Sequence, residues 1–259
     1  MVQAPAPLFP RASEPAIPER MEWTDQGIVL SARAHGEGGL IASLLTRERG
    51  RHAGFVPGGS SRKARPIWQP GNLLEVGWRG RLAEQLGNFS AELREPYAAL
   101  VLDEAASLAG LAAACAVLDA SLPEREPHPA LFEGFSALLG ALGVPGWPAL
   151  YVRLELGLLQ ELGFGLDLTQ CAATGETDGL GYVSPRTGRA VGRAAAAPYK
   201  EKLLVLPAFL GPGGGLPSEP GELAAGLDLT GFFLERHVFW PHNKPLPAAR
   251  ARFMETLTP

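Results

Sequence analysis

The sequence predicts an α+β protein with more than one domain, in which a small five-stranded β-barrel precedes an α-helical domain. Three observations carry this prediction. Short apolar segments with turn residues between them fill residues 21–95, alanine- and leucine-rich stretches with helical spacing follow Pro96, and residues 165–220 are rich in glycine and proline. Residues 1–20 form a proline- and alanine-rich extension that we expect to be flexible.

The strand prediction rests on five segments of similar length and close, even spacing. Glycine or proline separates each segment from the next, as at Pro57-Gly58-Gly59 and Pro70-Gly71. Evenly spaced short strands are typical of a small all-β barrel or sandwich. Residues 60–68 show no alternation and are expected to form a basic loop or a short helical turn. The five expected strands cover residues 27–34, 38–46, 51–59, 72–80 and 84–93.

The helical domain, residues 96–259, is expected to contain five helices and a loop-rich insertion at 165–220. The helices expected at 129–143 and 148–162 both open with proline at the first helical position, and they end at Gly143 and Gly163, which are common start and stop signals. The domain boundary falls near residues 92–96. The expected helices cover residues 97–120, 129–143, 148–162, 222–239 and 247–257.

Composition excludes several classes of protein. The 259 residues include only Cys115 and Cys171, so neither a disulfide framework nor a cysteine-rich zinc site is possible. No apolar run approaches the roughly 20 residues of a membrane span, and the first twenty residues, with five prolines, lack the apolar core of a secretory signal. We therefore expect a soluble cytoplasmic protein.

Enzymatic motifs are missing from the sequence. It has no G-x-S-x-G, H-E-x-x-H or phosphate-binding Walker loop, and the glycine-rich segment 211–215 lacks the Lys-Ser/Thr that would make it one. The five histidines fall at spacings that place no two on one helical face. We expect no catalytic residue and no cofactor, although a hydrolase with an unrecognised site stays open as an alternative.

Positive charge is concentrated in one segment of an acidic chain. The net charge is −4, yet residues 47–81 carry eight Lys or Arg against two acidic residues, and residues 93–259 carry twelve against eighteen. A five-stranded barrel that binds oligonucleotides, the OB-fold, uses cations along the phosphates and aromatic rings under the bases. Trp68, Trp78 and Phe55 could supply such rings, although aromatic residues at alternating positions, such as Phe55 and Trp78, more often belong to the core. The candidate DNA-binding residues are Arg33, Arg47, Arg49, Arg51, Arg62, Lys63, Arg65, Arg79 and Arg81.

The segment around Cys171 has the spacing of a metal-binding knuckle from which the other sulfurs are missing. Thr174 stands where a second cysteine of C-x-x-C would be, and Gly192 and Ala195 repeat that interval some twenty residues later. One thiolate cannot hold a tetrahedral zinc ion. We expect this loop to fold without metal.

Several segments form a recognisable series along the chain. The first half contains G-I-V-L-x-x-R-x-x-x-E at 27–37, L-x-T-R-x-x-G at 44–50 and LAEQLGNFSAEL at 82–93. The second half contains RLELGLLQELGFGLDLTQCAATG at 153–175, YVSPRTGRAV at 182–191 and FFLERHVF at 232–239. In this order the segments resemble the RecO family of bacterial recombination mediators, and the resemblance covers the chain from about Glu22 to its end.

The resemblance implies an N-terminal OB-fold and a helical C-terminal domain that often carries a four-cysteine zinc knuckle. It also implies binding of single- and double-stranded DNA, annealing of complementary strands, and partnership with RecR and single-strand-binding protein. Such proteins help to replace single-strand-binding protein by RecA at gaps, in the RecF-type pathway. We therefore expect a non-enzymatic, nucleoid-associated mediator. The alternative is an interaction scaffold whose barrel does not depend on DNA binding.

One partner site can be predicted on the helix at 148–162. Single-strand-binding proteins commonly end in an acidic tail with an apolar residue and a free carboxylate, which calls for an apolar groove beside a cation. Cations are scarce in the helical domain, and Arg153, Leu156 and Gln160 fall near one another at steps of three and four. The other possibility is that Arg153 pairs with a local carboxylate and that the leucines belong to the core.

Overall fold

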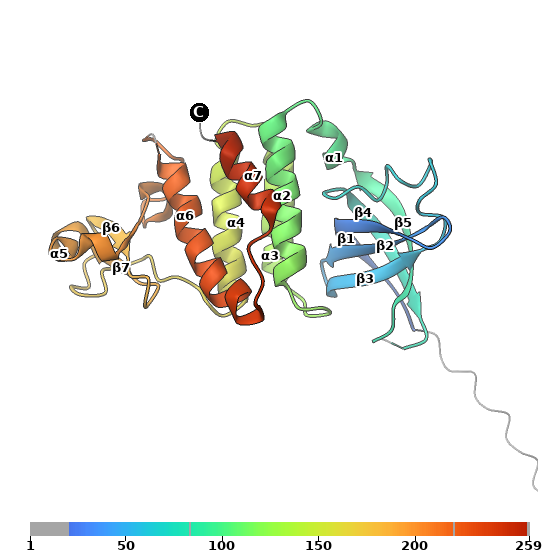
Figure 1. Cartoon of the computed structure of the whole chain (residues 1–259), viewed down its shortest axis with the longest axis horizontal. Helices are drawn as coiled ribbons and strands as arrows, with labels where there is room; N and C mark the ends of the chain where they lie inside the picture. Colours follow the sequence, from blue (N-terminus) through green and yellow to red (C-terminus); the bar gives the residue numbers. More distant parts are fainter. Residues whose placement is uncertain (1–20, 83, 220, 258–259) are drawn as a thin grey trace, which may run out of the picture.

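A computed structural model describes residues 21–82, 84–219 and 221–257. The expected extension at 1–20 lies outside the described residues. A barrel and a small three-stranded sheet lie at opposite ends of the elongated molecule, and the longer helices lie between them (Figure 1). Among the described residues, no helix combines the length and the apolar character that a membrane span requires.

Five strands form the N-terminal half, as the sequence predicts. They pair in the order β1-β2-β3-β5-β4, and pairing of β1 with β4 closes the sheet into a barrel. Neighbouring strands are antiparallel except β3 and β5, which are parallel. The strands are β1 (Met21–His35), β2 (Gly39–Thr46), β3 (Gly50–Val56), β4 (Leu73–Gly80) and β5 (Gly87–Glu95).

Alternation along the strands fills the barrel with apolar side chains. In β3 every second residue is buried, and in β4 Leu74, Val76 and Trp78 point inward. Trp78 stacks on Trp23, with ring centroids 5.7 Å apart. The rings therefore form the interior of the barrel.

After the barrel, most helices begin and end close to the predicted residues. The helices α3 and α4 end next to Gly143 and Gly163, which both have the positive φ typical of a residue just past a helix. A short π-helical turn, Glu235–Phe239, continues α6 to the predicted end. The helices are α1 (Tyr97–Leu100), α2 (Ala105–Ser121), α3 (Pro129–Ala141), α4 (Trp147–Glu161), α5 (Arg193–Ala196), α6 (Glu222–Leu234) and α7 (Ala248–Leu257).

The prediction of a single helix at 97–120 was wrong, because α1 and α2 both lie in this range. The first turn is held by the barrel, since the side-chain oxygen of Asn72 accepts a hydrogen bond from the backbone N–H of Ala98 (3.2 Å). The chain then turns at 101–104, and α2 begins after Asp103 and Glu104. Apolar spacing alone could not reveal this break, because it depends on a contact with a distant loop.

The loop-rich insertion contains more structure than its composition predicts. The strands β6 (Leu180–Val183), β7 (Ala190–Gly192) and β8 (Leu204–Val205) form a sheet in the order β7-β6-β8. Its own small core contains Cys171, Val191 and Ala196. Three short 3-10 turns, Lys200–Lys202, Ala208–Leu210 and Trp240–His242, complete the described elements.

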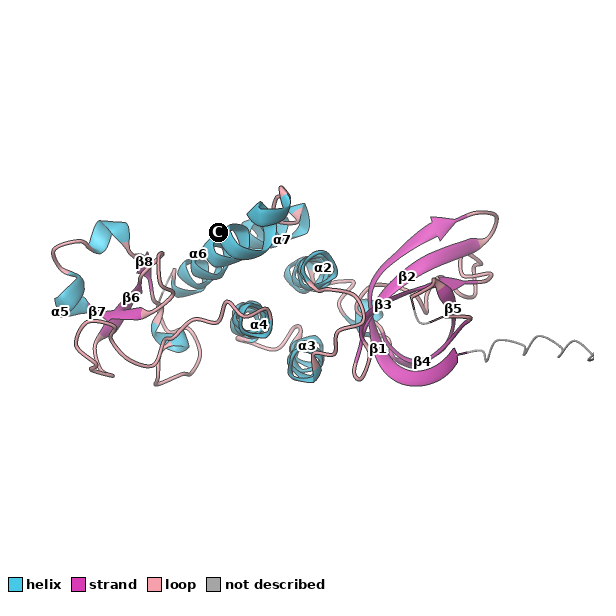
Figure 2. Cartoon of the chain, turned by 90° about the horizontal axis from the view of Figure 1, so that it is seen from below, coloured by secondary structure: helices cyan, strands magenta, loops and turns pink. Residues whose placement is uncertain are grey.

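The barrel interior has its own hydrophobic cluster, and the outer face of the barrel packs against the core of the helices. The outward-facing Ile28 and Leu30 of β1 and Leu45 of β2 pack into the same cluster as the helices, and α2 lies against β1 and β2. Figure 2 shows α2 and α3 as the helices next to the barrel. The domain boundary near residue 95 therefore separates two hydrophobic cores that meet across an apolar interface.

A buried ion pair fixes α7 against the helical core. Arg250 donates two hydrogen bonds to Glu155 of α4, at 2.7 and 2.9 Å, and another to the carbonyl of Leu227. Both side chains are almost fully buried. Because each charge is satisfied by the other, this pair orients α7 without leaving an unpaired charge in the core.

Candidate nucleic-acid interface

Five of the predicted DNA-binding cations are exposed and unpaired. Arg33 lies near the end of β1, Arg81 lies in the turn after β4, and Arg62, Lys63 and Arg65 lie in the connection between β3 and β4. Within the described parts of the chain, none of these five side chains makes a hydrogen bond or ion pair. Their charges are therefore available to an external anion.

Two further cations are exposed but have surface partners. Arg47 lies 2.6 Å from Glu133 of α3, and Arg79 donates two hydrogen bonds to Glu22 of β1, at 2.9 and 3.2 Å. The hydrogen bonds and the charge of Arg79 hold the pKa of Glu22 below its usual value. Surface ion pairs of this kind contribute little to stability, so a phosphate could replace either carboxylate.

Arg51 has a different environment, at the junction between barrel and helices. Its Nε donates to the carbonyl of Leu122 (2.8 Å), and its guanidinium lies 3.6 Å from Asp119 and 3.5 Å from Glu124. Asp119 also accepts hydrogen bonds from Ser31 (2.8 Å) and Ser43 (2.6 Å). With its side chain only 18% exposed, Arg51 joins β3 to α2, and we leave it out of the proposed interface.

Arg49 lies beside Arg51 in sequence but remains on the surface. Its guanidinium carbon is 5.9 Å from the centre of the Trp23 ring, at cation–π distance. The turn at 47–49 thus directs Arg47 and Arg49 outward, whereas Arg51 on β3 points toward α2. The sequence predicted instead that all three arginines could lie on the same side of an extended chain, because they occupy every second position.

The aromatic candidates are mostly interior. Trp68 and Trp78 are buried, and Trp68 stacks with Phe89 at 6.2 Å. Phe55 is half-buried, with its ring 6.1 Å from that of His35. Trp78 is therefore a core residue, one of the two interpretations that the sequence allowed.

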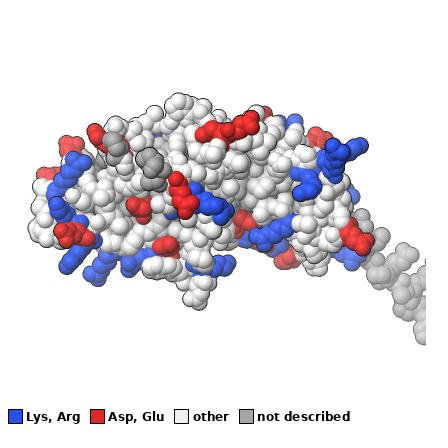
Figure 3. Space-filling model, turned by 45° about the horizontal axis from the view of Figure 1, so that its top comes forward, with Lys and Arg blue, Asp and Glu red and all other residues white. Residues whose placement is uncertain are grey.

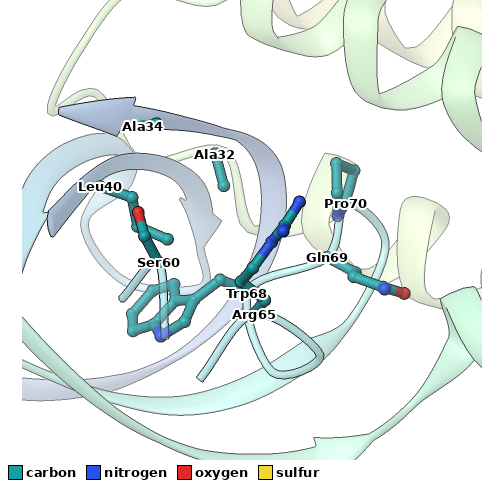
Figure 4. Close-up of a pocket in the computed structure, with 8 residues that line it drawn as sticks. All are labelled: Ala32, Ala34, Leu40, Ser60, Arg65, Trp68, Gln69 and Pro70. Carbon is teal, nitrogen blue, oxygen red and sulfur yellow. The ribbon is translucent and has the colours of Figure 1, made fainter. Parts of the chain in front are cut away.

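A groove on the barrel combines a cation with apolar walls. Its volume is about 400 Å³, and it lies between β1, β2 and the connection that follows β3. Figure 4 shows Arg65 extending along the groove toward Ala32 and Pro70, with the Trp68 indole at its base. The lining residues are Ala32, Ala34, Leu40, Ser60, Arg65, Trp68, Gln69 and Pro70.

A second groove lies between α3 and α4, where the sequence placed the partner site. Its volume is about 340 Å³, and its walls are mainly apolar. Arg153 and Gln160 line it together with Gly157, whereas Leu156 lies outside the lining and packs half-buried against the helical core. Arg153 also donates hydrogen bonds to the carbonyls of Phe209 (3.2 Å) and Gly215.

Comparison with known proteins agrees with this arrangement. The family model of the Recombination protein O N terminal matches residues 21–97, and that of the Recombination protein O C terminal matches residues 103–246. The chain belongs to the RecO family. It is 54% identical to the DNA repair protein RecO of Rhodospirillum centenum over 91% of this chain and 94% of that protein. It is also 54% identical to the DNA repair protein RecO of Phenylobacterium zucineum, over 92% and 98%, respectively.

Three of the four knuckle positions of this RecO-family chain line one hollow, and the fourth, Cys171, is buried. Thr174, Gly192 and Ala195 line a depression of about 740 Å³, and the backbone N–H of Gly192 donates to the Cys171 sulfur (3.2 Å). The Thr174 hydroxyl, followed by this N–H, lowers the pKa of Cys171 to about 7. Among the described residues, no three His, Cys, Asp or Glu side chains gather as metal ligands, so this site does not fit zinc.

The sequence analysis did not identify four exposed cations in the C-terminal region of this RecO-family chain. Arg186, Arg193, Lys200 and Lys202 all belong to the small sheet and its short helices. The whole-domain charge is acidic, which concealed them. A charge count in a shorter window would have found them, because residues 180–205 carry five Lys or Arg and one Glu.

Proposed function

We propose that this RecO-family protein is a non-enzymatic DNA-binding and strand-annealing protein that acts as a recombination mediator in DNA repair. The observation that carries the proposal is the set of five exposed, unpaired cations on the loops and strand ends of a barrel in an otherwise acidic chain. The relatives with half or more of their residues identical bear the name DNA repair protein RecO, which supports it. Its place of action would be the cytoplasm, on the nucleoid.

The barrel would bind DNA mainly through phosphate charges. Cations that neutralise phosphates release condensed counterions, and this term does not depend on base sequence. Helices cover the outer side of β1 and β2, which leaves the connection between β3 and β4 and the strand turns as the open surface. Figure 3 shows Lys and Arg side chains at this end of the molecule. The groove beside Arg65 could hold a nucleotide of a single strand.

Annealing would follow from the same electrostatics. Two complementary strands repel each other, and cations that contact both lower this repulsion until bases can pair. Loading of RecA would then depend on removing single-strand-binding protein from the gap. We include RecR as a further partner on the basis of the family alone.

The binding test is the triple variant Arg62→Ala, Lys63→Ala and Arg65→Ala. We expect weaker binding and a salt dependence reduced by up to three contacts, at about 0.9 per phosphate on duplex DNA. The matched control removes the exposed Arg236, Lys244 and Arg252 of the helical half. An unchanged salt dependence in the first variant would contradict the proposal and favour the interaction scaffold, and turnover of DNA would favour an enzyme.

The groove between α3 and α4 would bind the acidic tail of single-strand-binding protein. It places apolar walls next to the Arg153 guanidinium, which matches a tail with an apolar residue and a terminal carboxylate. Because Arg153 also ties down the segment at 209–215, substituting it tests two roles at once.

Filling the groove gives a cleaner test than removing the cation. A Cβ at Gly157 would meet no atom within 4 Å, so Gly157→Leu should fill the groove without strain. Helix propensity also favours leucine over glycine. We expect loss of tail-peptide binding with unchanged DNA annealing, and we expect Arg153→Glu to lose tail binding as well. Wild-type tail affinity in Gly157→Leu would exclude this groove.

A further inference from the structure

The end of the molecule opposite the barrel carries a second group of exposed cations. Arg186, Arg193, Lys200 and Lys202, here called the distal basic surface, make no side-chain hydrogen bond or ion pair with any residue that the structure describes. Outside segment 180–205, which contains these four cations, residues 93–259 carry seventeen acidic residues against seven cations. The distal basic surface is therefore a local reversal of charge.

The small sheet brings these cations together from separate parts of the chain. Arg186 lies in the turn between β6 and β7. The strand β8 runs antiparallel to β6, with Leu204 opposite Val183. Lys200 and Lys202, which precede β8, therefore enter the sheet at the end where the Arg186 turn lies. Arg193 begins α5 at the other end of the short hairpin.

An aromatic side chain lies among the cations. Tyr199 is 41% exposed and directly precedes Lys200. Cations combined with an exposed ring are the elements with which proteins hold single-stranded nucleic acid, because phosphates contact the charges and a base stacks on the ring. An acidic peptide tail would require an apolar groove as well, whereas the depression next to Arg193 is lined by polar and small residues such as Thr174, Thr177 and Ala195.

The two basic surfaces cannot belong to one compact site. The barrel and the small sheet lie at the two ends of the long axis, with the helices between them (Figure 1). In Figure 3, Lys and Arg side chains gather at both ends. A short strand bound at one end is therefore out of reach of the other.

We propose that the distal basic surface is a second binding site for single-stranded DNA, so that one molecule holds two strands, one at each end. This inference rests on the proposed function, because it takes the barrel as the first site. Strands longer than one site leave unbound segments that can meet, so holding both strands on one molecule raises the effective concentration of each for the other. Annealing then requires both surfaces, whereas binding of one short strand requires only one.

The test uses the full chain and three triple-alanine variants. The distal variant replaces Arg186, Lys200 and Lys202, and it retains Arg193, whose side chain packs against Gly181. The barrel variant replaces Arg62, Lys63 and Arg65. The control variant replaces Arg236, Lys244 and Arg252, which are also exposed. All three remove the same charge, so net charge alone cannot distinguish them.

Three measurements separate the outcomes. With oligonucleotides of about 6 nucleotides, which fit one OB-fold, we expect two per wild-type chain and one per distal variant. In the second measurement, the protein bridges a labelled strand to an immobilised non-complementary strand, and we expect the distal variant to lose this capture. In the third, we expect the distal variant to anneal complementary strands at least tenfold more slowly. Retained binding of one oligonucleotide and an unchanged circular dichroism spectrum would show that the distal variant is folded.

Wild-type stoichiometry, capture and annealing in the distal variant would overturn the inference and leave the proposed function intact. The inference would also be overturned if the distal variant lost binding of an acidic peptide and kept wild-type DNA binding. Tyr199→Ala provides a second, uncharged variant, in which we expect weaker capture with unchanged binding at the barrel. If the barrel variant binds DNA like the wild type, the proposed function itself fails.

Discussion

His52 is a buried histidine whose ring nitrogens have no hydrogen-bond partner among the described residues. It lies inside the barrel, with the rings of Trp23 and Trp78 about 5 Å away. Burial, followed by the charges of Arg125 and Arg49, lowers the pKa of His52 to about 4. The folded barrel therefore requires the neutral ring.

This environment predicts an acid-sensitive fold. The unfolded chain binds a proton at His52 below about pH 6.5, whereas the folded protein does so only near pH 4. The stability that His52 contributes is complete above pH 6.5 and is lost as the pH falls toward 4. We expect the free energy of unfolding to fall by roughly 1–2 kcal/mol between about pH 7 and pH 5.

Urea unfolding at the two pH values measures this loss. His52→Gln should remove it, because glutamine does not titrate, even if the variant is less stable at neutral pH. His242→Gln, at an exposed histidine, should retain the wild-type pH dependence. A His52→Gln variant with wild-type acid sensitivity would assign the effect to other groups.

The knuckle loop and the small sheet form an element that is built without metal ligands. Backbone hydrogen bonds take the place of a metal here, because Cys171 N donates to the carbonyl of Glu176 (2.7 Å) and Ala172 N donates to that of Ala190 (2.8 Å). The Cys171 sulfur is buried and accepts from Gly192. The loop is thus connected to both β7 and its own turn.

We predict that the protein folds and anneals DNA without zinc. A chelator should change neither the thermal unfolding midpoint nor the annealing rate, and elemental analysis should find less than one zinc per chain. Cys171→Ala should still fold, with a modest loss of stability from one buried hydrogen bond, about 1 kcal/mol. One tightly bound zinc per chain in metal-free buffer would contradict this prediction.

Over the whole molecule, the apolar interface between the outer face of β1 and β2 and the helices couples the barrel to the helical core. Asp119 of α2 accepts hydrogen bonds from β1 and β2 and lies near Arg51 of β3. Apolar side chains of β1 and β2 pack into the helical cluster. Neither half can unfold without exposing surface that the other half covers.

We therefore predict one cooperative unfolding transition. Tryptophan fluorescence, which reports largely on Trp23, Trp68 and Trp78 of the barrel, should give the same midpoint as far-ultraviolet circular dichroism, which reports on the helices. Asp119→Ala should lower both midpoints together, at a cost of about 1–3 kcal/mol. Glu133→Ala, which removes only a surface partner of Arg47, should change them little. Two separate transitions would show that the halves fold independently.

Local sequence patterns were enough to predict the five strands, most of the helices and the segment of concentrated charge. These features depend on local periodicity and on turn residues, which physical chemistry fixes within a few neighbouring positions. The predicted ends at Gly143 and Gly163 follow from backbone conformation alone. The family resemblance was also carried by local segments.

Which cations face outward depends on contacts between residues that are far apart in the sequence. Arg51 and Arg62 belong to the same basic segment, yet one contacts Asp119 across the junction and the other has no partner in the described chain. The same holds for the break before α2, which depends on Asn72, and for the distal basic surface, which depends on strand pairing in a segment that composition describes as loop. Contacts between residues far apart in sequence leave no local pattern, so they can be read only from the folded chain.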